Sequence, residues 1–263
     1  MQEIQVGNNT LQYQEAGSGE TTLLLMTGWC QDDRLYRHVI PLLAEHYHVL
    51  QVNYRGHREG LAYDGEFGAA ELIEDMAAVL DLKGVKQAVP ISCSHGGWVN
   101  IGLAEKLGIE RIPRCIVTDW AMNPPQEFHD GIKRGQTDEH WSEVRNHLYK
   151  IWIGGSRSQD VIDHCYKEFE EYGQEMWVRS CRVIEGVHNE WETPLKRIMA
   201  LAPSRPVAHI FSQPATEEYE ALHKQAAEAN PWFTYYRLQP GVSHFPTLES
   251  PEAYAAAVCD FVG

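Results

Sequence analysis

Short apolar runs alternate with helical stretches along most of this chain. The runs that predict buried strands cover residues 22–26, 48–53, 86–91, 114–118, 206–211 and 234–238. Helical patterns separate them at residues 36–46, 69–82, 96–107, 216–229 and 251–261. Strands that alternate with helices of this length imply right-handed crossovers and a mostly parallel sheet. The sequence therefore predicts an α/β fold, with a hairpin that joins residues 10–13 to the first buried run.

The alternation stops after Asn123-Pro124-Pro125. The following segment, residues 125–201, is rich in aromatic and charged residues but contains no convincing strand pattern. It holds four of the eight tryptophans, which are Trp141, Trp152, Trp177 and Trp191. We expect an α/β core at residues 1–124 and 202–263, and a helical cap at residues 125–201 whose aromatic face packs over that core.

Composition excludes several classes of partner. The net charge of −15 repels nucleic acids and anionic lipid surfaces, and no apolar run is long enough to span a bilayer. The six cysteines form no CxxC pair, and the 13 histidines form no metal-binding motif. We expect reduced thiols, no metal, no nucleic-acid or membrane partner, and a cytoplasmic location.

Residues 92–97, Ser-Cys-Ser-His-Gly-Gly, lie between a predicted strand and a predicted helix. This pattern is typical of a nucleophile elbow, a tight turn that exposes a serine at the start of a helix. Ser94 is the elbow residue, and Ser92 replaces the usual first glycine. The backbone N–H groups of His95 and Trp29 are the expected oxyanion donors, because free N–H groups and the helix dipole favour negative charge there.

A base and an acid follow later in the chain. His244 lies after the last predicted strand, where this kind of fold delivers its base. The strand at residues 206–211 is followed by Gln213, although hydrolases commonly place an acid there. Asp119, at the end of the preceding strand, is the better candidate to hold the Nδ1–H of the imidazole. Glu217 and Glu218 are alternative acids.

Arg55 and His57 lie in a Tyr-Arg-Gly-His turn, and we interpret them as turn and surface residues rather than ligands. We interpret His95 as part of a pocket wall rather than as a base.

The sequence resembles the cofactor-independent 3-hydroxy-4(1H)-quinolone 2,4-dioxygenases, which have the α/β-hydrolase fold. The matching segments extend from residue 28 to residue 246. They are Gly28-Trp-Cys-Gln-Asp, Tyr54-Arg-Gly-His, Ser94-His-Gly-Gly-Trp-Val, Val117-Thr-Asp-Trp, Ile151-Trp-Ile, Arg182-Val-Ile-Glu, His209-Ile-Phe-Ser-Gln-Pro and Ser243-His-Phe-Pro. Trp-Cys after the oxyanion glycine and Ser-Gln-Pro after the strand at 206–211 are not general hydrolase features.

The resemblance implies a role for each matching residue. His244 with Asp119 would be the base, and Ser94 would be a hydrogen-bonding partner. The substrate pocket would contain Trp29, His95 and Trp152, and we also expect contacts from Gln31 and Trp120. Some family members have histidine at the position of Gln31, so a polar contact there differs in this chain.

The resemblance also implies the reaction. A 3-hydroxy-4(1H)-quinolone, including 2-alkyl ones such as the Pseudomonas quinolone signal, would react with O2 without a cofactor, giving an N-acylanthranilate and carbon monoxide. Degrading that signal would quench quorum sensing. Residue spacing alone does not distinguish this reaction from hydrolysis of an ester, lactone or carbon–carbon bond with Ser94 as nucleophile. A third interpretation is a catalytically idle receptor for a small aromatic ligand.

Overall fold

The computed structural model describes residues 1–58, 63 and 65–263, and an eight-stranded sheet forms its centre. The strand order is β1-β2-β4-β3-β5-β6-β7-β8. From β4 to β8 all neighbouring strands are parallel, while β1 and β2 are antiparallel to their neighbours. The strands are β1 (Gln2–Val6), β2 (Asn9–Ala16), β3 (Thr22–Met26), β4 (His48–Val52), β5 (Ala88–Cys93), β6 (Cys115–Thr118), β7 (Val207–Phe211) and β8 (Phe233–Arg237). The predicted mostly parallel α/β architecture is confirmed.

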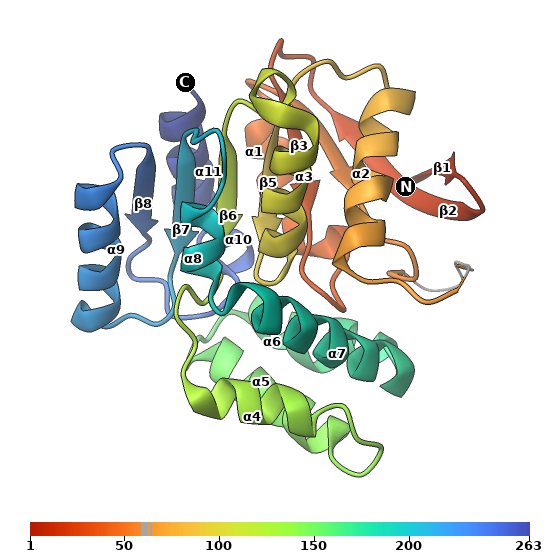
Figure 1. Cartoon of the computed structure of the whole chain (residues 1–263), viewed down its shortest axis with the longest axis vertical. Helices are drawn as coiled ribbons and strands as arrows, with labels where there is room; N and C mark the ends of the chain where they lie inside the picture. The colour runs from red at the N-terminus through yellow and green to blue at the C-terminus, as the bar shows by residue number, and fades with distance from the viewer. Residues whose placement is uncertain (59–62, 64) are drawn as a thin grey trace.

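Helices cover both faces of the sheet, with α2 and α3 in front of it and α1 and α11 behind it in Figure 1. These helices and those around them are η1 (Asp33–Tyr36), α1 (Val39–Leu43), α2 (Ala69–Leu82), α3 (Gly96–Arg111), α9 (Glu217–Ala229), α10 (Pro246–Glu249) and α11 (Pro251–Val262). Because both faces are covered, the central strands read as continuous apolar runs, and every residue of β3, β5, β6 and β7 is buried.

Two local predictions were wrong. The strand β2 does not form a hairpin with β3; it pairs with β1 on one side and with β4 on the other. The polar strand β1 occupies the sheet edge and has little apolar alternation to reveal it. The helix expected at residues 36–46 is only the short α1, because Pro41 lacks the N–H that a helix interior needs and is tolerated only in a first turn.

The segment between β6 and β7 consists of helices without a strand, and the structure describes it throughout. Its helices are α4 (Gln126–Arg134), α5 (Trp141–Ile153), α6 (Gln159–Asp163), η2 (His164–Glu168), η3 (Phe169–Glu171), α7 (Gln174–Trp191) and α8 (Pro194–Met199). Figure 1 shows α4 to α7 beyond the end of the sheet toward which the arrow of β8 points. We call α4 to α7, with η2 and η3, the cap helices.

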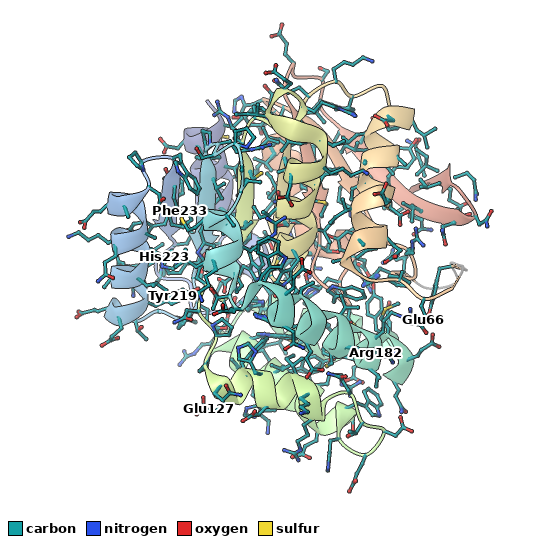
Figure 2. All side chains as sticks on the ribbon, viewed as in Figure 1. Glu66, Glu127, Arg182, Tyr219, His223 and Phe233 are labelled. Atoms are coloured by element: carbon teal, nitrogen blue, oxygen red, sulfur yellow. The ribbon has the colours of Figure 1, made fainter. Side chains whose placement is uncertain are left out.

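Charged groups attach the cap helices to the core. Arg34, which follows β3, forms ion pairs of 2.6 Å with Asp32 and with Glu171 of η3. The hydroxyl of Tyr172 donates a 2.9 Å hydrogen bond to the buried Asp32. On α7, Arg182 lies near Glu66 (Figure 2), with 3.9 Å between the guanidinium and the carboxylate. The contacts with Asp32 and Arg34 hold the cap helices over the loop that follows β3, and the Arg182 pair joins α7 to the segment before α2.

Candidate active site

Ser94 stands on a strained turn between β5 and α3. Its φ is +50°, a left-handed conformation that is costly for a residue with a side chain. The backbone N–H of Ser94 donates to the carbonyl oxygen of Thr118 at 2.8 Å, which ties the turn to β6. Ser92 is fully buried, and its hydroxyl accepts a 3.0 Å hydrogen bond from the side chain of Asn100 on α3.

The two glycines after the turn are required by close packing. A Cβ at Gly96 would lie 2.1 Å from the carbonyl oxygen of Thr27, and a Cβ at Gly97 would lie 2.3 Å from the ring of Trp120. The indole of Trp120 is fully buried there and packs edge-on against Trp98, with ring centroids 4.8 Å apart. The expected substrate contact of Trp120 stays a prediction, and the structure shows its ring filling the space under α3.

Asp119 and His244 form a buried pair. The imidazole Nδ1 of His244 lies 3.0 Å from Oδ1 of Asp119. The other carboxylate oxygen, Oδ2, accepts the backbone N–H groups of Ser212 at 2.8 Å and Gln213 at 3.2 Å. Because a carboxylate only accepts, Nδ1 carries a proton, and in the neutral form of the ring Nε2 then presents a lone pair. The side chain that the sequence singled out as the acid is the one that orients this imidazole.

The imidazole of His244 also stacks on a cap residue. Its ring lies 5.5 Å from that of Trp152, with 14° between the planes, and its backbone N–H donates to the carbonyl oxygen of Trp152 at 2.7 Å. The Nε2 atom is buried and has no hydrogen-bond partner among the described residues, so Ser94 and His244 are not hydrogen bonded. A buried lone pair without a partner is able to accept a proton from a bound molecule.

A pocket opens between the elbow and the cap helices. Its polar wall contains Gln31, Ser94, His95 and Ser180, and its aromatic wall contains Trp29, Phe128, Trp152 and Trp177. Ile132, Leu148 and Ile184 add an aliphatic side. A few polar groups within a mostly apolar wall are typical of a small-molecule site. The structure thus brings together Ser94, Trp29, His95, Trp152 and Gln31 around one space, with His244 packed behind Trp152.

Gln31 and His57 shape the loop after β3 that supplies the expected oxyanion donor Trp29. The Gln31 side chain accepts the backbone N–H of Gly28 at 2.9 Å, and the Nε2 atom of His57 accepts the backbone N–H of Cys30 at 3.0 Å. The backbone N–H groups of Trp29 and His95 donate to no other described residue. Both therefore remain available to a ligand oxygen.

The interpretation of Arg55 and His57 as surface residues was wrong. His57 is fully buried, and Arg55 forms an ion pair of 2.5 Å with the buried Asp75. Burial lowers the pKa of His57 to about 4, so the ring is neutral and can accept the Cys30 N–H. The Tyr-Arg-Gly-His motif marked this turn in the sequence, but a motif does not reveal whether its side chains point into the protein.

Two further buried histidines, His209 and His223, support the loop that carries Asp119. The backbone N–H of Trp120 donates to His209 Nε2 at 3.1 Å, so the proton of that ring is on Nδ1 and donates to His223 Nε2 at 2.6 Å. His223 in turn donates to the carbonyl oxygen of Tyr219 at 2.7 Å. On α9, His223 also faces Phe233 of β8 (Figure 2). The alternative acids Glu217 and Glu218 are exposed at the start of α9.

The buried neutral histidines make stability depend on pH. The pKa of His57 is below its unfolded value of about 6.5, so the unfolded state binds more protons at acidic pH. The stability contributed by His57 is complete above pH 6.5 and is lost as the pH falls toward 4. We expect this residue to account for about 2 kcal/mol of the loss in unfolding free energy between about pH 7.5 and about pH 5.

Urea unfolding of His57→Gln at both pH values measures this contribution, since glutamine can accept the Cys30 N–H without titrating. The exposed His46→Gln is the matched control and should keep the full pH dependence of the wild type. Equal pH dependence in His57→Gln and the wild type would show that His57 does not stay neutral in the folded protein.

Three further features of the molecule concern metal ions, membranes and cysteines. Among the described residues, no group of three or more histidine, cysteine, aspartate and glutamate side chains is arranged to hold a metal ion. In the same part of the chain, no helix has the length and apolar character needed to cross a membrane. All six cysteines are free, and five of them are buried.

Comparisons with known proteins cover the whole chain. The Alpha/beta hydrolase family model matches residues 19–257. The chain is 36% identical to the 1H-3-hydroxy-4-oxoquinoline 2,4-dioxygenase of Pseudomonas putida, over 100% of this chain and 99% of that protein. It is 37% identical to the 2-heptyl-3-hydroxy-4-quinolone dioxygenase AqdC2 of Rhodococcus erythropolis, over 96% of this chain and 94% of the relative. The solved structure of an AqdC variant with its substrate, the Pseudomonas quinolone signal, matches with a TM-score of 0.95 and 33% identity, over 99% of this chain and 98% of that one.

Proposed function

Because this chain belongs to the α/β-hydrolase family and, within it, to the 3-hydroxy-4-quinolone 2,4-dioxygenases, we propose that it cleaves the heteroaromatic ring of a 3-hydroxy-4(1H)-quinolone with O2. The observation that carries this proposal is the buried Asp119–His244 pair, whose Nε2 has no partner among the described residues and whose ring stacks on Trp152 of the pocket wall. We propose that this nitrogen removes the proton of the 3-hydroxyl group.

The proposed chemistry begins with a substrate anion. Asp119 holds the Nδ1–H, so Nε2 can accept the 3-hydroxyl proton and the resulting imidazolium is stabilised by the carboxylate. The N–H groups of Trp29 and His95 and the hydroxyl of Ser94 can donate to the oxygen that becomes negative. Burial of the ring lowers the pKa of His95 well below its ordinary value, and the nearby His188 and His244 lower it further, so His95 does not compete as a cation.

The electrons that reduce O2 come from the substrate itself. The anion transfers one electron to O2, and the two radicals join to form a peroxide at C2. The peroxide closes on the C4 carbonyl, and the O–O, C2–C3 and C3–C4 bonds then break. Carbon C3 leaves as carbon monoxide, and the remaining atoms form the N-acylanthranilate. This scheme balances without a metal or flavin, and it needs a pocket that excludes water from the anion.

The pocket walls are suited to the parts of such a substrate. Trp152 and Trp177 are stacked, with ring centroids 6.2 Å apart, and offer flat surfaces to the ring. Ile132, Leu148 and Ile184 offer an aliphatic side to a 2-alkyl substituent. Gln31 is fixed by its bond to Gly28 and lines the same space. We propose that these residues determine which quinolone is accepted.

We also propose that residues 1–124 and 202–263 act as the core and residues 125–201 as a cap that closes the pocket. If the substrate is the 2-heptyl compound acted on by the Rhodococcus relative, the activity would quench quorum signalling. The six free cysteines suit a reducing compartment, so we propose that the protein acts in the cytoplasm.

A serine hydrolase is the second candidate function, because Ser94 stands on a strained elbow with a histidine and an acid nearby. Such an enzyme activates its serine through a hydrogen bond to the histidine. Here the Nε2 atom of His244 has no partner, which supports the dioxygenase instead. A stoichiometric reaction of Ser94 with an organophosphate would support the hydrolase.

Oxygen uptake tests the proposed function directly. Metal-free and flavin-free protein is mixed with a 3-hydroxy-4(1H)-quinolone, and dissolved O2 and released carbon monoxide are followed together. We expect one O2 consumed and one carbon monoxide released for each quinolone cleaved. Hydrolysis of ester or lactone substrates without any quinolone cleavage would contradict the proposal.

A further inference from the structure

Gln213 occupies the position after β7 where hydrolases commonly place the acid, but Asp119 already fills that role. Its side-chain Nε2 donates to the carbonyl oxygens of Ile151 at 2.7 Å and Val242 at 3.0 Å. Its backbone N–H donates to Asp119 at 3.2 Å. One residue thus contacts a cap helix, the loop that carries His244 and the acid.

The contact with the cap lies at the C-terminal end of α5. The last carbonyl groups of a helix have no partner within the helix and need one from outside. Here the carbonyl of Ile151 receives the Gln213 amide, and the carbonyl of Trp152 receives the backbone N–H of His244. The last turn of α5 is therefore bonded both to Gln213 and to the loop that carries His244, which we call the base loop, while the indole of Trp152 stacks on the imidazole.

Close packing at Gly154 reinforces this junction. Gly154 follows α5 with a φ of +59°, and a Cβ there would lie 2.3 Å from the carbonyl oxygen of Val242 and 2.4 Å from Nε2 of Gln213. The next residue, Gly155, also has a positive φ of +87°, but a Cβ there would meet nothing within 4 Å. Only the first glycine is required by the approach of the cap to the base loop.

The core holds the other side of the same loop. The carboxylate of Glu249 accepts the backbone N–H groups of Val242 at 2.9 Å and Ser243 at 2.8 Å. The base loop is thus fixed between a core carboxylate and the Gln213 amide. A carboxylate at position 213 could not take over, because it has no N–H to donate to two carbonyl oxygens.

We propose that Gln213 is a positioning residue that couples the cap to the base, so that His244 reaches the substrate hydroxyl only when Trp152 is seated in the pocket wall. The amide acts through His244 and touches neither the substrate nor the reacting atoms. This inference rests on the proposed function, since it assigns a task to the residue that replaces the hydrolase acid. It accounts for a glutamine at a position where ester hydrolysis would favour a carboxylate.

Gln213→Met tests the coupling, because methionine keeps the length of the side chain but donates no hydrogen bond. The matched control is Gln87→Met, since Gln87 donates to the carbonyl oxygen of Glu110 near the end of another helix at 3.1 Å and lies on the surface. The substrate is a 3-hydroxy-4(1H)-quinolone, bound first without O2. Under those conditions the absorption spectrum reports how much bound substrate is ionised.

We expect Gln213→Met to bind the quinolone within about threefold of the wild type, because the pocket walls remain. The ionised fraction should fall, and kcat should fall about 10-fold, since a base displaced by a fraction of an ångström loses much of its effect. Gln87→Met should match the wild type in both measurements. Equal ionisation and equal kcat in Gln213→Met and the wild type would overturn the proposal.

A second pair of variants guards against a simple loss of folding. Gly154→Ala pushes the cap away from the base loop, while Gly155→Ala introduces a comparable backbone strain without that contact. We expect Gly154→Ala to reproduce the loss of substrate ionisation expected for Gln213→Met. Gly155→Ala should keep the ionised fraction of the wild type. If both alanine variants behave alike, the coupling is wrong. If the wild type itself cleaves no quinolone, the proposed function fails instead, so the two failures are distinguishable.

Discussion

Replacing His244 by alanine is expected to lower kcat/KM for a 3-hydroxy-4(1H)-quinolone by about 10²- to 10⁴-fold, the range that a positioned general base contributes. The Nε2 atom of this imidazole is buried and has no partner among the described residues, and the ring stacks on Trp152 of the pocket wall, so alanine leaves no group there to accept the 3-hydroxyl proton. Oxygen uptake and carbon monoxide release at saturating O2 measure the loss.

Ser94→Ala distinguishes a dioxygenase from a serine hydrolase, since both would lose activity in His244→Ala. A dioxygenase that uses Ser94 only as a hydrogen-bond donor should keep appreciable activity without it, whereas a serine hydrolase should lose nearly all. Added imidazole should partly restore His244→Ala, because the space between Trp152 and Phe245 is shaped for that ring. Loss of all quinolone cleavage in Ser94→Ala, with organophosphate labelling of the wild type, would contradict the mechanism.

Asp119→Asn is expected to be nearly as damaging, at about 10²- to 10⁴-fold in kcat, although it changes only one atom. The Oδ2 position faces two backbone N–H groups, from Ser212 and Gln213, so the amide oxygen must lie there. The amide NH2 then faces Nδ1 of His244. That nitrogen must become the acceptor, the proton moves to Nε2, and the ring can no longer take a proton from the substrate.

The tautomer of His244 and its effect on the bound quinolone can both be measured. Nitrogen chemical shifts of the His244 ring should show the proton on Nδ1 in the wild type and on Nε2 in Asp119→Asn. The quinolone should still bind without O2 but remain un-ionised. Wild-type ionisation of bound substrate in Asp119→Asn would mean that another group is the base.

The N-terminal half of the site could be predicted from residue patterns because its parts are close in sequence. The elbow needs a strand, a small-residue turn and a helix in succession, and residues 88–111 carry all three signals. The pairing of His244 with Asp119 followed from strand order, since parallel strands bring their carboxyl ends to one edge of the sheet. The position of the Trp120 ring under α3 could not be predicted, because adjacency to Asp119 in sequence does not determine which way a side chain points.

His57 and Gln213 were missed as supporting groups for the same reason. A Tyr-Arg-Gly-His turn and a Ser-Gln-Pro turn look like surface connections until the burial of their side chains is known. The partners of the Gln213 side chain are the carbonyl oxygens of residues 151 and 242, which lie 62 and 29 residues away from Gln213 along the chain. No local pattern encodes such contacts, because the backbone atoms involved are the same in every residue.

The alternation of strands and helices, the elbow turn and the candidate base and acid could be predicted from the amino-acid sequence, because apolar periodicity and turn chemistry act over a few residues and the crossover rule then favours a parallel sheet. Tertiary structure alone decided the pairing of β2 with β4, the inward turn of His57 and Trp120, and the seating of α5 on the base loop. Each of these depends on which surfaces are buried against which, and burial is a property of the folded chain as a whole.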